Sequence, residues 1–397
     1  MKYSTHLLLL ALSSAAFSTA QAANYTVIDL GVGAGYASRA TGVNNSGTVV
    51  GNIRDDTHAD GTTTNSGFRY FYTGGVMETL RYDTPNLTGS SQYGPVLHHQ
   101  TAAYAINNAG QVAGSIDING WSALGAAAGS QGPYATIFQP DGSVDFFPGL
   151  EGSVSQALAI NSAGLIAGTT WPNSVSQAGV PGIVDIDGSW HRIPSTGSYG
   201  AAFGMNDLGQ TVGANGGFRT FLSTGGTTTL ISNTLGGNDL FSATDINNNG
   251  VVVGSAGTTG QRHAYTYTES GGMVDLGALL PGYFSEALAI NDSGLVVGSG
   301  ASPNGVRALL WSEATGAVDL NTLLLNSSNL FLVAATAVSE NGFIAGYGIS
   351  SLDGQEHAFL LTPDSITSSV PEAGATACLM FLGLAGLAGV RRKVSRA

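Results

Sequence analysis

The stretch AINNAGQVAG, from Ala105 to Gly114, decides the fold because versions of it return along the whole chain. The seven copies are GVNNSGTVVG from Gly42, AINNAGQVAG from Ala105, AINSAGLIAG from Ala159, GMNDLGQTVG from Gly204, DINNNGVVVG from Asp245, AINDSGLVVG from Ala289 and AVSENGFIAG from Ala337. In each copy an apolar stretch enters a polar turn and a second short apolar stretch leaves it. A unit that recurs in this way indicates a repeat architecture.

Each copy predicts a tight β-hairpin. Asn107 can hydrogen-bond the backbone two residues on, and Gly110 can take a positive φ without a Cβ clash. Val112 to Gly114 then returns as a short buried strand. Turn chemistry therefore accounts for the recurring Asn and Gly. Only DINNNG, from Asp245, also resembles the start of a calcium loop, and this match fails because Ala256 stands where the loop needs a bidentate acid.

The repeat unit contains four short strands. The turn glycines follow one another at a mean step of about 49 residues, a period typical of propeller blades or solenoid coils. In the sixth copy the strands are expected at Ser285 to Asn291, Leu295 to Gly300, Val306 to Trp311 and Ala317 to Asn321. Four strands in two hairpins make one propeller blade. The alternatives are a β-solenoid, whose coils usually have a shorter period, or a propeller of a different blade count.

The two chain ends predict how the ring closes. The seventh copy provides three strands, the last being HAFLLTP from His357 to Pro363, and no fourth strand follows. A matching strand, YTVIDLG, lies at the opposite end from Tyr25 to Gly31. Closing the last blade with this strand removes the exposed edges that an open stack would present. We therefore predict an all-β, seven-bladed β-propeller over residues 23–363, closed by the N-terminal strand.

The first residues predict export. Residues 1–22 contain a basic residue, an apolar run and an A-x-A cleavage site at Ala20 and Ala22, as in a secretory signal peptide. The only cysteine is Cys378, so the exported body has no disulfide and depends on its hydrophobic core.

The body is acidic. Between residues 23 and 369 it carries eight arginines, no lysine and 25 acidic residues, which gives a net charge of −17. Such a surface repels phosphate backbones and anionic lipid headgroups. Nucleic acid is therefore excluded as an expected partner.

The repeat resembles the HAF-repeat family of bacterial extracellular proteins. The resemblance is carried by A-x-I-N-x-x-G-x-V-V-G, an H-A-F-like strand and V-D-L-G, and it covers about Tyr25 to Pro363. The literal triplet is best kept at His357-Ala358-Phe359 and His263-Ala264-Tyr265. The family implies an extracellular location and no established activity.

The C-terminal residues predict a sorting segment. After a linker at residues 364–369, the segment 370–397 contains Val370-Pro371-Glu372, an uncharged and mostly apolar run of 16 residues, and the basic cluster Arg391-Arg392-Lys393. A helical run of this length reaches about 24 Å, so it needs flanking residues to span a hydrocarbon core of about 30 Å. The positive-inside rule keeps the basic cluster cytoplasmic.

This tail resembles the PEP-CTERM sorting signal of Gram-negative bacteria, which an exosortase recognises. Ala373 departs from the family, which usually has a second proline there. A plain transmembrane anchor is the alternative.

No catalytic motif is present. G-x-S-x-G, H-E-x-x-H and paired Cys motifs are all absent, which excludes the usual serine-hydrolase and zinc sites. The long loops of the first two units lie opposite the N-x-x-G turns and carry the candidate binding residues, because long loops on a rigid scaffold often bind ligands. These candidates are Asp55, Asp56, His58, Asp60, His98, His99 and Trp121.

Two functions remain open at this point. The first is a non-catalytic cell-surface or matrix protein that binds an exopolysaccharide or a surface protein and is processed by an exosortase-type enzyme after anchoring in the inner membrane. The second is a secreted glycan-active hydrolase or lyase that uses the loop acids. Carboxylates facing each other across a cleft would favour the enzyme, and an aromatic groove would favour binding. No cofactor is expected, and calcium is the one metal left open.

Overall fold

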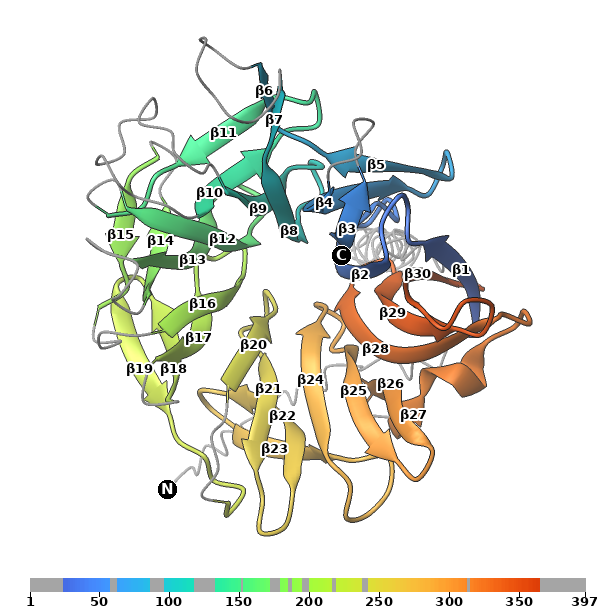
Figure 1. Ribbon diagram of the computed structural model, residues 1–397. Helices are drawn as coiled ribbons and strands as arrows, with labels where there is room; N and C mark the ends of the chain where they lie inside the picture. The colour runs from blue at the N-terminus through green and yellow to red at the C-terminus, as the bar shows by residue number, and fades with distance from the viewer. Residues whose placement is uncertain are drawn as a thin grey trace, which may run out of the picture. The chain divides into compact units, whose positions relative to one another are not determined.

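The computed structural model describes residues 24–57, 63–85, 96–117, 133–150, 153–171, 179–184, 188–194, 200–215, 219–237, 242–312 and 315–364. They form seven four-stranded antiparallel sheets arranged in a ring (Figure 1). The prediction of a seven-bladed β-propeller is confirmed. Within these ranges the only complete helix is the short 3-10 helix η2 (Leu320–Leu323), and none of the described helices is long and apolar enough to cross a membrane.

The first four blades follow the chain order, each from its innermost strand outward. Blade 1 contains β2 (Ala37–Val43), β3 (Val49–Thr57), β4 (Thr63–Phe71) and β5 (Val76–Leu80). Blade 2 contains β8 (Gln100–Ile106), β9 (Val112–Asp117), β10 (Pro133–Phe138) and β11 (Val144–Phe147). Blade 3 contains β12 (Val154–Ile160), β13 (Ile166–Trp171), β14 (Val180–Val184) and β15 (Trp190–Arg192). Blade 4 contains β16 (Gly200–Met205), β17 (Thr211–Asn215), β18 (Thr220–Thr224) and β19 (Thr227–Ile231).

The remaining blades repeat this order until the chain ends meet. Blade 5 contains β20 (Ser242–Ile246), β21 (Val252–Gly257), β22 (Arg262–Thr268) and β23 (Gly272–Gly277). Blade 6 contains β24 (Ser285–Ile290), β25 (Val296–Ser302), β26 (Gly305–Ser312) and β27 (Gly316–Asp319). Blade 7 contains β28 (Leu330–Val338), β29 (Ile344–Ser350), β30 (Glu356–Pro363) and β1 (Tyr25–Gly31). A separate hairpin of β6 (Asp83–Pro85) and β7 (Val96–His98) lies between blades 1 and 2 in the chain.

The N-terminal strand closes the ring as predicted. Strand β1 pairs antiparallel with β30, with Tyr25 opposite Pro363 and Val27 opposite Leu361. Both Tyr25 and Val27 are buried, and they belong to one apolar cluster that joins blades 6 and 7. The first and last strands of the propeller therefore share a core.

The repeated H-A-F and V-D-L-G segments pair within a blade. In blade 7, His357 Nδ1 lies 2.8 Å from Asp29 Oδ1, and in blade 5, His263 Nδ1 lies 2.9 Å from Asp275 Oδ2. The aromatic residue of the triplet is buried, and Phe359 is 0% exposed. The His and Asp of the signature thus tie the third strand of a blade to its fourth.

The chain divides into a unit Met1–Asp364, which contains the propeller, and a unit Ser365–Ala397. The signal residues Ala20 and Ala22 lie outside the described residues. The sorting residues Val370, Pro371, Glu372, Arg391, Arg392 and Lys393 lie outside them as well.

Candidate functional site

The side chain of the first residue in each N-x-x-G turn is held by the backbone N–H groups of the residues that follow it. In blade 4, Asn206 Oδ1 accepts hydrogen bonds from the backbone N–H of Leu208 at 3.1 Å and of Gln210 at 2.9 Å. Gly209 takes a φ of 75°, which its lack of a Cβ permits. The predicted turn chemistry is confirmed, and it leaves the amide Nδ2 of the asparagine to bond outside the turn.

This amide joins six of the seven blades to the blade that follows. The asparagine circle consists of Asn44, Asn107, Asn161, Asn206, Asn247, Asn291 and Ser339. Each of the six asparagines donates from Nδ2 to the backbone oxygen of the following member, at 3.0–3.4 Å. Ser339 has no amide to donate. Its Oγ accepts from the backbone N–H of Phe343 at 3.1 Å, as the asparagine Oδ1 does in the other turns. The circle therefore lacks one side-chain bond, between blades 7 and 1.

The second turn residue forms another circle. The polar circle consists of Asn45, Asn108, Ser162, Asp207, Asn248, Asp292 and Glu340. In six of its seven members the backbone N–H donates to the side-chain oxygen of the following member, at 2.7–3.1 Å. The exception among these described residues is Asn108, whose neighbour is the short Ser162. The side chains of this circle are held in place by the blades on either side.

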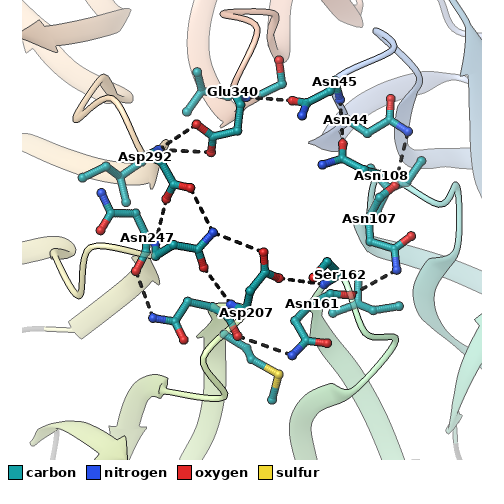
Figure 2. A pocket seen from close by; sticks show the side chains of 18 of the residues that line it. Asn44, Asn45, Asn107, Asn108, Asn161, Ser162, Asp207, Asn247, Asp292 and Glu340 are labelled. Atoms are coloured by element: carbon teal, nitrogen blue, oxygen red, sulfur yellow. Dashed lines mark hydrogen bonds between the residues drawn. The ribbon is translucent and has the colours of Figure 1, made fainter. Parts of the chain in front are cut away.

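A pocket of about 210 Å³ lies inside the two circles (Figure 2). Its wall is polar and comes from both circles, and apolar side chains also line it: Val43, Ile106, Ile160, Met205, Ile246, Ile290 and Val338. All seven blades contribute, so the pocket lies on the axis of the ring, on the side of the N-x-x-G turns.

The pocket is negatively charged. Its lining includes Asp207, Asp292 and Glu340 and no lysine, arginine or histidine. Partial burial, together with the neighbouring carboxylates of Asp292, Asp245 and Asp207, raises the pKa of Glu340 to about 7. Burial also raises the pKa of Asp207, but bonds from Ser162 and Asn248 outweigh it and leave that pKa below its ordinary value.

Asp245 adds a fourth carboxylate beside the pocket. Six copies of the repeat have Ala or Gly at this position. Asp245 accepts hydrogen bonds from the backbone N–H of Ile246 at 2.8 Å and of Ile290 at 3.0 Å. Burial, with a contribution from Asp292, raises its pKa to about 6. Gly204 of blade 4 makes room for it, because a Cβ at that position would lie 2.8 Å from the Asp245 Cα.

Three of the residues predicted from the loops, Asp55, Asp56 and His99, lie within the described residues, near the strand ends away from the N-x-x-G turns. Asp55 and Asp56 lie near the end of β3, where Asp55 has a φ of 53° and the buried Asp56 pairs with Arg81 at 3.2 Å. His99 is also buried and its Nδ1 lies 3.2 Å from the backbone oxygen of Asp117.

The remaining loop candidates are not placed. His98 ends β7, but its side chain lies outside the described part, as do His58, Asp60 and Trp121 altogether. Among the described residues no three acidic, histidine or cysteine side chains converge closely enough to hold a metal ion. The described candidates Asp55, Asp56 and His99 therefore form no metal site.

The sequence analysis missed the axial pocket. The second turn residue of every copy bears a side-chain oxygen, and aligning the seven copies would have shown this. Turn chemistry explains each copy by itself, so the side-chain oxygen that all seven second turn residues share does not indicate a pocket in any single copy. Only the ring geometry places seven such residues around one cavity.

Comparisons with known proteins support the fold alone. No family model and no curated protein matches the chain. The β-propeller domain of the Trilobed protease from Pyrococcus furiosus is 9% identical, with 88% of this chain and 98% of that chain covered and a TM-score of 0.50. Acylaminoacyl peptidase from Pyrococcus horikoshii is 8% identical, with 86% of this chain and 52% of that chain covered and a TM-score of 0.48. The Pyrococcus furiosus domain has an open velcro topology, whereas β1 closes blade 7 here.

Proposed function

We propose that this protein is an exported cell-surface or extracellular-matrix protein whose propeller is a rigid, non-catalytic binding module of the HAF-repeat type. The observation that carries the proposal is the state of the pocket carboxylates. Both oxygens of Asp207, Asp292 and Glu340 accept hydrogen bonds from neighbouring turns. Carboxylates held in this way form a fixed wall that binds a ligand without needing to move.

Retention on the producing cell's matrix tests this function. The purified full chain is mixed with the extracellular polysaccharide of that cell, and bound protein and released reducing ends are both measured. We expect retention without cleavage. A chain that does not bind contradicts the proposal, and steady release of reducing ends contradicts its non-catalytic part.

The loop face is the second candidate for the bound surface. The Trp121→Ala/His98→Ala double variant tests it in the same retention measurement. Loss of retention with an unchanged urea unfolding curve assigns binding to the loops. Unchanged retention assigns it to the side of the axial pocket.

A glycan-active enzyme is the alternative function, and one observation favours it. The pKa of Glu340 is raised and that of Asp207 is lowered within one pocket. Two carboxyl groups whose pKa values are pushed apart are what acid–base cleavage of a glycosidic bond uses. The reducing-end measurement separates this enzyme from the binding module.

We further propose that residues 1–22 direct export and that the segment 370–397 anchors the chain in the inner membrane until an exosortase-type enzyme cuts near Val370-Pro371-Glu372. The support is the sequence pattern of both ends. A tag placed after Ala397 should be absent from the mature surface form, and a tag placed after Ala23 should remain. Recovery of both tags on one full-length membrane species would indicate a permanent anchor instead.

A further inference from the structure

The wall of the axial pocket has two chemically different arcs. The arc from blades 4 to 7 carries the carboxylates of Asp207, Asp292 and Glu340. The arc from blades 1 and 2 carries the amides of Asn45 and Asn108, whose Oδ1 atoms accept backbone hydrogen bonds from the preceding blade. In the part of the chain that the structure describes, no protein acceptor is found for the Nδ2 groups of these two residues. The pocket thus offers negative charge on one side and neutral donors on the other.

The carboxylate arc favours a cation. Like charges gathered in a partly desolvated site repel one another, and a bound cation relieves that repulsion. No basic side chain among the lining residues does this. The described acids do not converge as metal ligands, so the cation that fits is one held by hydrogen bonds from several directions, as an ammonium group is.

The amide arc favours neutral hydroxyl groups. An anionic group beside the amides would require a positively charged partner, and the lining provides none. Free amide N–H groups instead suit the oxygens of a polyol. At about 210 Å³ the pocket exceeds the cavity of about 150 Å³ that accommodates benzene, so it has room for one six-membered ring. Its apolar lining, Ile106 and Ile246 among it, can contact the carbon face of such a ring.

We propose that the axial pocket binds an amino sugar in its protonated form, with the ammonium group against the carboxylates and the hydroxyl groups against the amides of blades 1 and 2. This inference rests on the proposed binding function and names the class of ligand. It places the ligand on the side of the N-x-x-G turns, opposite the long loops.

Calorimetric titration of the purified full chain with three sugars tests the chemistry. Glucosamine carries the ammonium group, glucose lacks the nitrogen and N-acetylglucosamine carries a neutral amide. We expect glucosamine to bind about tenfold or more tightly than the other two, as for a hydrogen bond to a charged group. Equal binding of all three, or no binding of glucosamine, overturns the proposal.

The pH dependence gives a second measurement on the same ligand. Asp207, Asp292 and Glu340 line the pocket, Asp245 lies beside it, and burial raises the pKa of Glu340 to about 7. Ionisation of these groups strengthens the attraction to the ammonium group. Glucosamine should therefore bind about tenfold or more tightly at pH 7 than at pH 5. An affinity that falls over this range contradicts the proposal.

Two matched variants locate the site. Glu340→Gln removes one charge and keeps an acceptor for the Asp292 backbone, and it should weaken glucosamine binding about tenfold. Asp141→Asn removes one exposed charge from a different turn and should leave binding unchanged. Equal effects of both variants would overturn the assignment to the pocket.

The two proposals fail in different ways. A chain that is retained on the polysaccharide but does not bind glucosamine disproves the amino-sugar site and keeps the binding function. A chain that binds glucosamine but is not retained on the polysaccharide keeps the site and disproves the matrix function.

Discussion

The boundary between blades 5 and 6 and the boundary between blades 7 and 1 use the same contacts, although the residues in contact are 21 positions apart in the chain at the first and 320 positions apart at the second. In each, a buried serine from the inner strand accepts a hydrogen bond from the third strand of the preceding blade. Ser285 accepts from the Ala264 N–H at 2.9 Å, and Ser38 accepts from the Ala358 N–H at 2.8 Å. The boundary between blades 7 and 1, which we call the seam, therefore uses the ordinary contacts of a blade boundary.

The residue next to each serine forms an ion pair with the preceding blade, and the two pairs have opposite orientation. Between blades 5 and 6, Arg262 of the third strand pairs with Glu286 of the inner strand at 2.8 Å. At the seam, Glu356 of the third strand pairs with Arg39 of the inner strand at 2.6 Å. At these two boundaries the position carries opposite charges, and either strand can carry either charge.

The asparagine circle shows the real difference. Asn247 donates to the Asn291 oxygen at 3.0 Å, whereas Ser339 has no amide to donate to blade 1. The seam lacks this one bond, and blade 7 beside it is completed only by β1, which comes from the other end of the chain and pairs with β30. The outer strand is thus where blade 7, with β1, should differ most from blade 5, with β23, in its effect on stability.

Deleting residues 24–31 should have the largest effect. The loss of β1 exposes the sites that bury Tyr25 and Val27 and opens blade 7 at β30. Burial of two such side chains contributes about 3–6 kcal/mol to the free energy of unfolding. Urea unfolding of the full chain with and without these residues measures the change.

A substitution on the equivalent strand of blade 5 serves as the control for this deletion. Val274 is 54% exposed, so Val274→Ala should leave the unfolding midpoint nearly unchanged. An unchanged midpoint for the deletion variant as well would show that β1 does not lock the ring.

The serine contact should be equally important at both boundaries. Ser38→Ala and Ser285→Ala each leave a buried N–H, of Ala358 or Ala264, without its acceptor. Each variant should lose about 1–3 kcal/mol of unfolding free energy. Parallel urea curves measure both. If Ser38→Ala lowers the unfolding free energy more than Ser285→Ala does, by more than the experimental error, the seam is the weaker boundary.

These contacts explain why the sequence predicted the closed ring. A turn such as N-x-x-G depends on side chains within four residues, and its geometry can be inferred from a single copy. The pairing of YTVIDLG with HAFLLTP followed from a comparison of copies, because the seventh copy lacks a fourth strand and YTVIDLG resembles MVDLG of the fifth copy. His357 and Asp29 contact each other across the chain ends.

The pocket depends on positions that no single copy reveals. Asp207, Asp292 and Glu340 each resemble ordinary exposed turn residues in the sequence. Their shared environment arises only when seven turns meet at the axis. Asp245 was considered as part of a calcium loop, and its actual place depends on Gly204 in the preceding blade. Long-range geometry of this kind cannot be inferred from spacing alone.

Restoring the missing amide should strengthen the seam. In Ser339→Asn, the new Oδ1 can accept from Phe343 and the new Nδ2 can donate toward blade 1, as in the other six turns. One such bond should add about 0.5–1.5 kcal/mol to the free energy of unfolding. Asn291→Ser creates the same defect between blades 6 and 7 and should lose a similar amount. A destabilised Ser339→Asn protein would show that the seam cannot accommodate the larger side chain.

The smallest expected effect comes from exchanging the charges of the seam ion pair. Arg39→Glu and Glu356→Arg each place like charges together, and the double variant recreates the orientation found between blades 5 and 6. Because the Arg39 side chain is 54% exposed, each single change should cost only about 0.2–1 kcal/mol, and the double variant should recover most of it. The bond to Arg39 lowers the pKa of Glu356, so the stabilisation by this pair is present at neutral pH and is lost as the pH falls through that lowered pKa. Urea unfolding of the four proteins at pH 7 and at pH 3 measures the coupling. If the double variant recovers nothing at pH 7, the orientation of the pair matters, because the guanidinium of Arg39 also lies 4.4 Å from the ring of Tyr347 and would lose that contact when moved to β30.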